Sequence, residues 1–150
     1  MRKTEIHAAD EMERELASSL LAGSEPWITL GITAEQCKKT CNDPELLLYM
    51  AYTDYRPSGV IVLDPRGVAG SPYMKSIAVY PEFRGQGIGA TLLSFAEELF
   101  KGKSRHLFLC VSSFNHRAKK FYESHGYQVV GEFKDYIIEG KSEILMHKWI

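Results

Sequence analysis

Ser76-Ile77-Ala78-Val79-Tyr80-Pro81-Glu82-Phe83-Arg84-Gly85-Gln86-Gly87-Ile88-Gly89-Ala90 joins an apolar strand pattern to a helical pattern through a glycine-rich turn. Glycines at 85, 87 and 89 let a ligand approach the backbone N–H groups closely. The first turn of the following helix has N–H groups without intrahelical partners, and the helix dipole places partial positive charge there. Arg84 adds a permanent cation. The sequence therefore predicts a phosphate or pyrophosphate site at this turn.

Length and composition indicate one globular domain over residues 1–150, with 45% hydrophobic and 25% charged residues. A formal net charge of -1 predicts neither nucleic acid nor an anionic membrane as a partner. The N-terminus lacks the apolar region of a signal peptide, and the longest apolar run, residues 46–52, is too short to span a bilayer. Three cysteines without a secretory feature favour reduced thiols and a cytoplasmic location.

Cys37 and Cys41 have the i, i+4 spacing of metal ligands on a helix. No second Cys/His pair at metal-ligand spacing accompanies them, so we expect two free thiols and no metal site.

Periodicity and turn residues predict four helices and seven strands. Capping boxes at Asp10 with Glu13 and at Thr33 with Gln36 begin two helices, which end near Leu21 and Asn42. Apolar stripes over 92–100 and 118–125 predict the other two. Strands are expected at 4–7, 45–53, 60–63, 73–79, 106–111, 127–133 and 143–149, with turns at 54–59 and 64–67. This order predicts an α/β or α+β fold, a mixed sheet flanked by helices.

Three interpretations of the glycine turn can be compared from the residues alone. A P-loop is excluded because no Lys-Ser/Thr follows the last glycine. A dinucleotide fingerprint matches formally at Gly85, Gly87 and Ala90, but residues 81–84 separate it from the strand and the next strand ends without a carboxylate. A tight turn without a ligand explains one or two glycines, but not three alternating glycines after an arginine.

Two motifs resemble those of the GNAT N-acetyltransferase superfamily. The pattern V-x-P-x-x-R-G-x-G-I-G-x-x-L-L, from Val79 to Leu93, resembles its acetyl-coenzyme-A-binding motif, and residues 115–127 resemble the motif that follows. The C-terminal half looks most like the ribosomal-protein-alanine acetyltransferase subgroup. The resemblance implies a single-domain, mixed and largely antiparallel sheet with about four helices, splayed at the cofactor site.

The resemblance also implies a function. The cofactor is acetyl-coenzyme A, and a primary amine attacks its thioester directly. The acceptor is a small-molecule amine or a peptide or protein N-terminus, such as that of a ribosomal protein, and a monomer and a homodimer both remain open. A non-catalytic acyl-coenzyme-A-binding regulatory domain is the alternative from another class.

The family's cofactor contacts fall on the strand end, the glycine turn and the cap of the second motif. By the resemblance they are Ile77, Ala78, Val79, Arg84, Gly85, Gln86, Gly87, Ile88, Gly89, Ala90 and Asn115. Asn115 and Tyr122 are seven residues apart, which places them on one helix face about 10 Å apart. Periodicity alone favours a core tyrosine at 122, whereas the resemblance implies a catalytic tyrosine that protonates the departing thiolate.

The general base is left open by the sequence. Cys110 stands where the nearest subgroup has a catalytic glutamate, and a neutral thiol is a poor substitute, so a buried strand cysteine is expected there. The remaining candidates are a relayed water, Glu132, Glu143 and Asp54. Residues 26–30, with Trp27, follow the first helix, where the family shapes its acceptor pocket.

Overall fold

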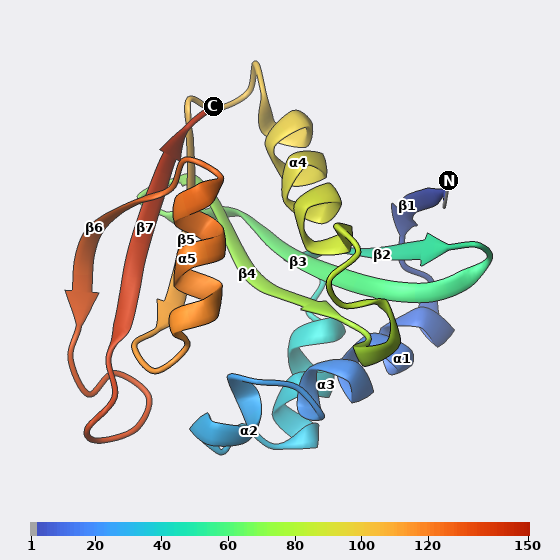
Figure 1. Cartoon of the computed structure of the whole chain (residues 1–150), viewed down its shortest axis with the longest axis horizontal. Helices are drawn as coiled ribbons and strands as arrows, with labels where there is room; N and C mark the ends of the chain where they lie inside the picture. The colour runs from blue at the N-terminus through green and yellow to red at the C-terminus, as the bar shows by residue number, and fades with distance from the viewer. Residues whose placement is uncertain (1–2) are drawn as a thin grey trace.

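A seven-stranded mixed sheet forms the centre of the computed structural model, which describes residues 3–150 (Figure 1). Its order is β1-β2-β3-β4-β5-β7-β6, and every neighbouring pair is antiparallel except β4 and β5. The strands are β1 Thr4–Ala8, β2 Leu47–Thr53, β3 Arg56–Val68, β4 Ser71–Val79, β5 His106–Ser112, β6 Gln128–Phe133 and β7 Glu143–Trp149. The expected mixed, largely antiparallel sheet is confirmed.

Five α-helices and one 3₁₀ turn accompany the sheet in the described part of the chain. They are α1 Glu11–Ala22, α2 Trp27–Leu30, α3 Ala34–Cys41, the 3₁₀ turn Pro81–Phe83, α4 Ile88–Phe100 and α5 His116–Ser124. Both expected capping boxes are present, at Asp10 and Thr33. Helix α2 was not predicted, because four residues are too few to show a helical period.

The expected bounds of the third strand were wrong. Asp54 and Tyr55 both have positive φ, as in the two-residue turns that join antiparallel strands, so β3 begins at Arg56 and not after residue 59. At its other end β3 runs through the expected turn at 64–67 and reverses only at Ala69 and Gly70. Its last pair with β2 is Leu63 with Leu47, so Pro65 interrupts no ladder on that side.

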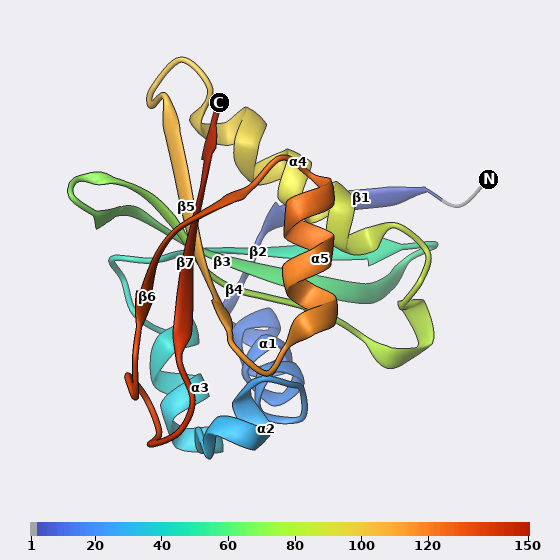
Figure 2. The ribbon, with the colours of Figure 1, turned by 60° about the vertical axis from the view of Figure 1, so that its left-hand side comes forward.

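Helices cover both faces of the β1–β4 half of the sheet (Figure 2). Ile61 and Leu63 of β3 belong to the core cluster beneath α4, and Val60 and Val62 belong to the cluster beneath α1 and α3. Residues 60–63 are therefore apolar without alternation, since both of their faces are buried.

The sheet is split between β4 and β5. These strands pair only through Tyr73 with Phe108 and Met74 with Leu109, and they diverge beyond this point (Figure 1). Lys75 follows at once and has no partner in the β3 ladder, because Leu63 pairs with Met74 and Val62 pairs with Ser76. A one-residue bulge of this kind bends its strand. The splay implied by the resemblance is thus present and begins at Lys75.

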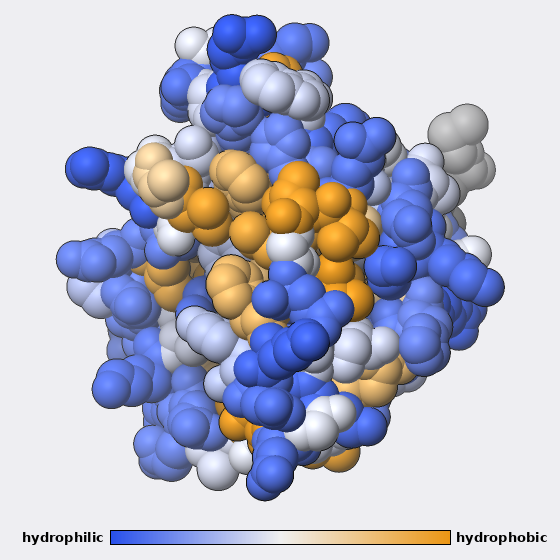
Figure 3. Space-filling model, turned by 90° about the vertical axis from the view of Figure 1, so that its left-hand side faces the viewer, coloured by the Kyte–Doolittle hydropathy of each residue, from blue (hydrophilic) through white to orange (hydrophobic). Residues whose placement is uncertain are grey.

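The opposite end of the sheet presents an apolar edge. Strand β6 is the last strand, and Val129, Val130 and Phe133 are exposed on it. Figure 3 views the molecule from the side of β6 and β7, where apolar side chains form a band bordered by hydrophilic ones. Among residues 3–150, no helix is both long enough and apolar enough to cross a bilayer.

Gly59 is the point where a side chain on β3 would meet α4. A Cβ atom there would lie 2.9 Å from the Ala78 carbonyl oxygen and 3.0 Å from Leu92 Cδ1. We expect Gly59→Ala to lower the free energy of unfolding by about 1–3 kcal/mol in urea titrations, because the packed core must shift to make room.

Gly131→Ala is the matched control in β6, where an added Cβ would have no neighbour within 4 Å. It should leave the free energy of unfolding unchanged or raise it by up to about 1 kcal/mol. Equal stabilities of the two variants would contradict the close packing of α4 on Gly59.

Candidate active site

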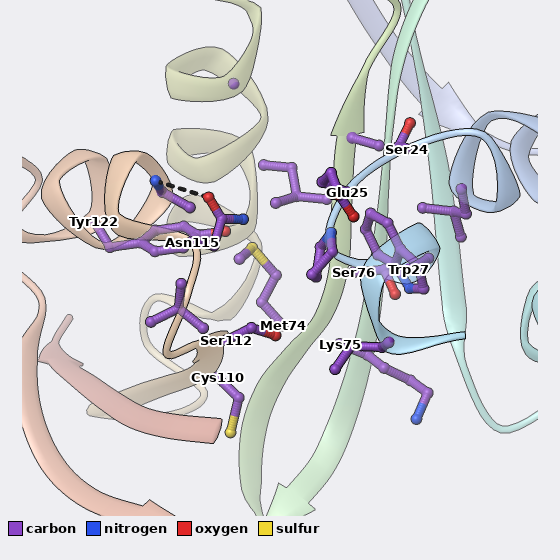
Figure 4. Close-up of a pocket in the computed structure, with 18 of the residues that line it drawn as sticks. Ser24, Glu25, Trp27, Met74, Lys75, Ser76, Cys110, Ser112, Asn115 and Tyr122 are labelled. Atoms are coloured by element: carbon purple, nitrogen blue, oxygen red, sulfur yellow. Dashed lines mark hydrogen bonds between the residues drawn. The ribbon is translucent and has the colours of Figure 1, made fainter. Parts of the chain in front are cut away.

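A cleft of about 1440 Å³ opens where β4 and β5 diverge. One wall is formed by the ends of β4 and β5, residues 84–90 and α5, and the other includes α2 with its preceding loop (Figure 4). Ligand pockets commonly measure about 300–1,000 Å³. This cleft therefore has room for a long ligand and a second molecule beside it.

The glycine turn forms a cradle without side chains. Gly85 and Gly87 have φ of +73° and +83°, in the left-handed region, and a Cβ on either would have no neighbour within 4 Å. Helix α4 begins after Gly87 without a side-chain cap and without an acidic residue in its first turn. Its first N–H groups thus lack both intrahelical and side-chain partners, and this geometry suits a phosphate or pyrophosphate.

The expected cofactor residues come together at this cleft with one exception. Gln86 does not line it, and its Nε2 instead donates to the Glu82 carbonyl oxygen at 3.0 Å. The residues that line it are Ile77, Ala78, Val79, Arg84, Gly85, Gly87, Ile88, Gly89, Ala90 and Asn115.

The end of β4 offers backbone groups to the cleft. From Ser76 to Val79 the strand pairs only with β3, so its other edge has no strand partner within the described chain. The side chains of Ile77 and Val79 pack against the core, as expected. Arg84 Nε donates to the Val79 carbonyl oxygen at 3.1 Å, so the guanidinium lies over the strand end.

Helix α5 carries Asn115 and Tyr122 into the cleft. Asn115 is the N-cap, and its Oδ1 accepts from Ala118 N at 3.3 Å (Figure 4). Tyr122 is 6% exposed, with its ring edge-on to those of Phe121 and Tyr127. Its hydroxyl bonds to no residue in the described part of the chain, where every buried side-chain oxygen has a partner. The hydroxyl is therefore partly exposed, on a residue that lines the cleft.

Burial raises the pKa of Tyr122 far above its usual value. The phenol consequently remains protonated at neutral pH. A protonated hydroxyl that opens to a cleft is a proton donor for whatever binds there.

A second group of polar side chains lies on the β4–β5–β7 face of the cleft. Cys110 on β5 is partly buried, which raises its thiol pKa, and Tyr73 on β4 hydrogen bonds to it. Glu143 begins β7 directly opposite Ser112, whose Oγ donates to Glu143 Oε2 at 2.6 Å. Burial also raises the pKa of Glu143.

Tyr73 and Ser112 were not predicted from the sequence, and Glu143 was only one of several candidate carboxylates. Ser112 and Glu143 meet because β7 inserts between β5 and β6, and Tyr73 lies near them because β4 pairs with β5; no local spacing in the sequence reports that strand order. The other two carboxylate candidates, Asp54 and Glu132, do not line the cleft. Asp54 lies in the β2–β3 turn, and Glu132 accepts a hydrogen bond from Ser142 Oγ at 3.0 Å.

Cys37 and Cys41 are buried free thiols on α3, as expected. Within residues 3–150, no group of three or more His, Cys, Asp or Glu side chains is placed to hold a metal ion.

Comparisons with known proteins agree with this architecture. The model of the acetyltransferase (GNAT) family matches residues 9–127. A Bacillus subtilis (strain 168) protein, named as a candidate ribosomal protein bS18-alanine N-acetyltransferase, is 40% identical over 76 residues, 50% of this chain and 50% of that protein. The match thus spans about half the length of this curated relative.

Solved structures share the fold. The crystal structure of a candidate GNAT-family acetyltransferase from Desulfovibrio desulfuricans superposes with a TM-score of 0.81 at 16% identity, covering 99% of each chain. A candidate streptothricin acetyltransferase from Bacillus anthracis, solved with acetyl coenzyme A, gives a TM-score of 0.65 at 24% identity and covers 75% of this chain and 66% of that one. Since the family model also matches most of the sequence, the chain belongs to the acetyltransferase (GNAT) family.

Proposed function

We propose that the protein is an acetyl-coenzyme-A-dependent N-acetyltransferase in which a primary amine attacks the bound thioester directly. One observation carries this proposal. The uncapped start of α4, which suits an anion, lines the same cleft as Tyr122, whose unpartnered hydroxyl suits proton donation.

The cleft supports the donor in two places. Backbone N–H groups of residues 85–90 and the Arg84 guanidinium can bind a pyrophosphate, and each charge-assisted hydrogen bond contributes about 1.5–3 kcal/mol. The unpaired edge of β4, which includes Ile77, can bind the amides of the pantetheine arm as a neighbouring strand would. Asn115 would contact the same arm from α5.

Tyr122 supplies the proton in this mechanism. Expulsion of a thiolate is costly, and a phenol held at the sulfur lowers that cost by protonating it. Burial keeps the hydroxyl protonated, and no other residue in the described chain competes for it.

The acceptor is a primary amine, and a protein N-terminus is the candidate that a specific observation favours. The Bacillus subtilis relative is named as a candidate alanine N-acetyltransferase that acts on ribosomal protein bS18. A free α-amino group, with a pKa of about 7.7–8.0, is also easier to deprotonate than a lysine at about 10.4. The test below also includes small-molecule amines, because half of this chain and half of the Bacillus subtilis protein lie outside their sequence match.

Thiol release from acetyl-coenzyme A tests the proposal. The acceptors are an alanine-initiated peptide, its N-acetylated form as the blocked control, alaninamide, and a panel of lysine-containing peptides and aminoglycosides. We expect turnover on at least one free amine and none on the blocked peptide. Binding of coenzyme A without turnover on any acceptor would favour the non-catalytic alternative.

Gly87→Ala should weaken acetyl-coenzyme A binding by at least tenfold in calorimetry, because the added methyl group occupies the cradle and strains a residue with φ of +83°. Gly102→Ala is the matched control at the other end of α4, with φ of +82° and equally open space. It should lose similar stability but keep its affinity. Equal affinities in the two variants would exclude the glycine turn as the pyrophosphate site.

Tyr122→Phe should lower kcat about 100-fold or more while the affinity for coenzyme A stays within twofold of wild type. Its thermal stability should be unchanged, since the hydroxyl has no protein partner to lose. Tyr127→Phe should keep the wild-type kcat but lower the thermal stability, because the Tyr127 hydroxyl donates to Glu97 Oε2 at 2.9 Å. Full turnover in Tyr122→Phe would show that the thiolate is protonated by another group.

A further inference from the structure

The reaction proposed above also needs a group that removes a proton from the acceptor. An acceptor amine is mostly an ammonium ion at neutral pH and cannot attack until it loses a proton. Cys110 cannot take that proton, because burial keeps its thiol protonated. Within the described chain, two carboxylates line the cleft, Glu25 and Glu143.

Glu25 is occupied as a cap. Its Oε1 accepts from Thr29 N at 2.8 Å and its Oε2 from Thr29 Oγ1 at 2.5 Å, so both oxygens hold the start of α2. These bonds lower the pKa of Glu25, which makes it a weaker base than an ordinary glutamate.

Glu143 has the opposite character. Its Oε2 accepts from Ser112, and its Oε1 has no hydrogen-bond partner in the described structure. No fully buried side-chain oxygen of residues 3–150 lacks a partner, so Oε1 keeps some exposure although the residue is only 9% exposed, and Glu143 lines the cleft. Ser112 thus fixes the carboxylate and leaves one oxygen for a ligand.

The surroundings of Glu143 keep its basicity high. The titratable groups that face it are Cys110 on β5 and Tyr73 on β4, and burial keeps both neutral. Its β6 partner is Phe133, and no cation forms an ion pair with it in the described chain. An unpaired carboxylate in such surroundings holds a proton more tightly than one in water.

The strand register places Glu143 beside Cys110, the position where the resemblance leads us to expect a glutamate. Ser112 pairs with Glu143, and Cys110 pairs with Leu145. Directly paired residues lie on the same face of a sheet, so Glu143 and Cys110 are diagonal neighbours on one face. The charge of Glu143 raises the pKa of the Cys110 thiol and that of the Tyr73 hydroxyl on β4, as its closeness to both would require.

We propose that Glu143 is the general base of this enzyme and receives a proton from the acceptor ammonium on the cleft face beside Cys110 and Tyr73. The inference rests on the proposed function. The carboxylate accepts one proton from the ammonium, and the neutral amine forms a bond to the thioester carbon. As the carbon–sulfur bond breaks, the sulfur takes the Tyr122 proton, and the second proton of the nitrogen restores the phenol. Glu143 then releases its proton to solvent.

Glu143→Gln tests the assignment, because glutamine keeps the shape and an oxygen for Ser112 but cannot accept a proton. With acetyl-coenzyme A and the best acceptor of the panel, we expect kcat/KM to fall about 100-fold. The wild-type rate should rise with pH as Glu143 deprotonates, above the ordinary value of 4.5. The rate of Glu143→Gln should not show this rise. It should recover partly at alkaline pH, where the amine deprotonates unaided.

Three further variants sharpen the result. Glu132→Gln, on the neighbouring strand and outside the cleft, should keep the wild-type rate. Adding Cys110→Glu to Glu143→Gln should restore part of the rate, because it returns a carboxylate to the same face one residue pair away. Glu25→Gln distinguishes the other cleft carboxylate, and a larger loss there than in Glu143→Gln would overturn the proposal.

Stability separates this role from a structural one. A carboxyl whose pKa is raised in the folded state stabilises the fold only while protonated, so this contribution is lost as pH rises above 4.5 and through the folded-state pKa. Glu143→Gln should therefore melt at a higher temperature than wild type at neutral pH and at the same temperature in acid. A variant that is less stable and has an unchanged pH–rate profile would mean that Glu143 is structural.

The two levels of proposal fail differently. A wild-type enzyme that transfers acetyl to none of the amines overturns the proposed function and, with it, the need for a base. An active wild type with an equally active Glu143→Gln variant overturns the base alone.

Discussion

The parallel pairing of β4 with β5 is limited to two residue pairs, and the rest of the site depends on this limit. The unpaired Lys75 bends β4 at the point where pairing stops. Beyond it, the β4 edge is free to bind amides, and β5 presents Cys110 and Ser112 to the gap. A fully paired sheet would have closed the cleft and satisfied the backbone groups that are proposed to hold the donor.

The proposed donor and acceptor functions are divided between backbone groups and side chains. The proposed donor site consists mainly of N–H groups and a strand edge, which many sequences can supply provided that the glycines remain. The proposed acceptor side of the cleft consists of side chains on β4, β5 and β7 and of α2, and the chemical nature of each side chain matters there. Cys110, which by the resemblance stands where the nearest subgroup has a glutamate, illustrates this division, because a change on the proposed acceptor side leaves the backbone groups of the turn intact.

Features encoded by neighbouring residues were predictable from the sequence, and features that depend on strand order were not. The capping boxes, the turn at 84–90 and the Asn115–Tyr122 face are local, and each lies where it was expected. The bounds of β3 were not predictable, because Pro65 and Gly67 indicate a turn unless the bulged pairing with β4 is known. Glu143 could be named only as one of several candidates, since its closeness to Ser112 arises from the insertion of β7 beside β5.

Helix α4 differs from three of its neighbours in the described chain. Helices α1, α3 and α5 begin with Asp10, Thr33 and Asn115 as side-chain caps, whereas α4 begins after a glycine. An anionic donor bound there supplies the missing cap, and it can do so only in the folded state, where the N–H groups converge. Folding and donor supply are then linked by mass action, and a concentration 100 times the dissociation constant adds about 2.7 kcal/mol to the free energy of unfolding. The lifetime of such a protein against unfolding and proteolysis would follow the acetyl-coenzyme A level of its surroundings.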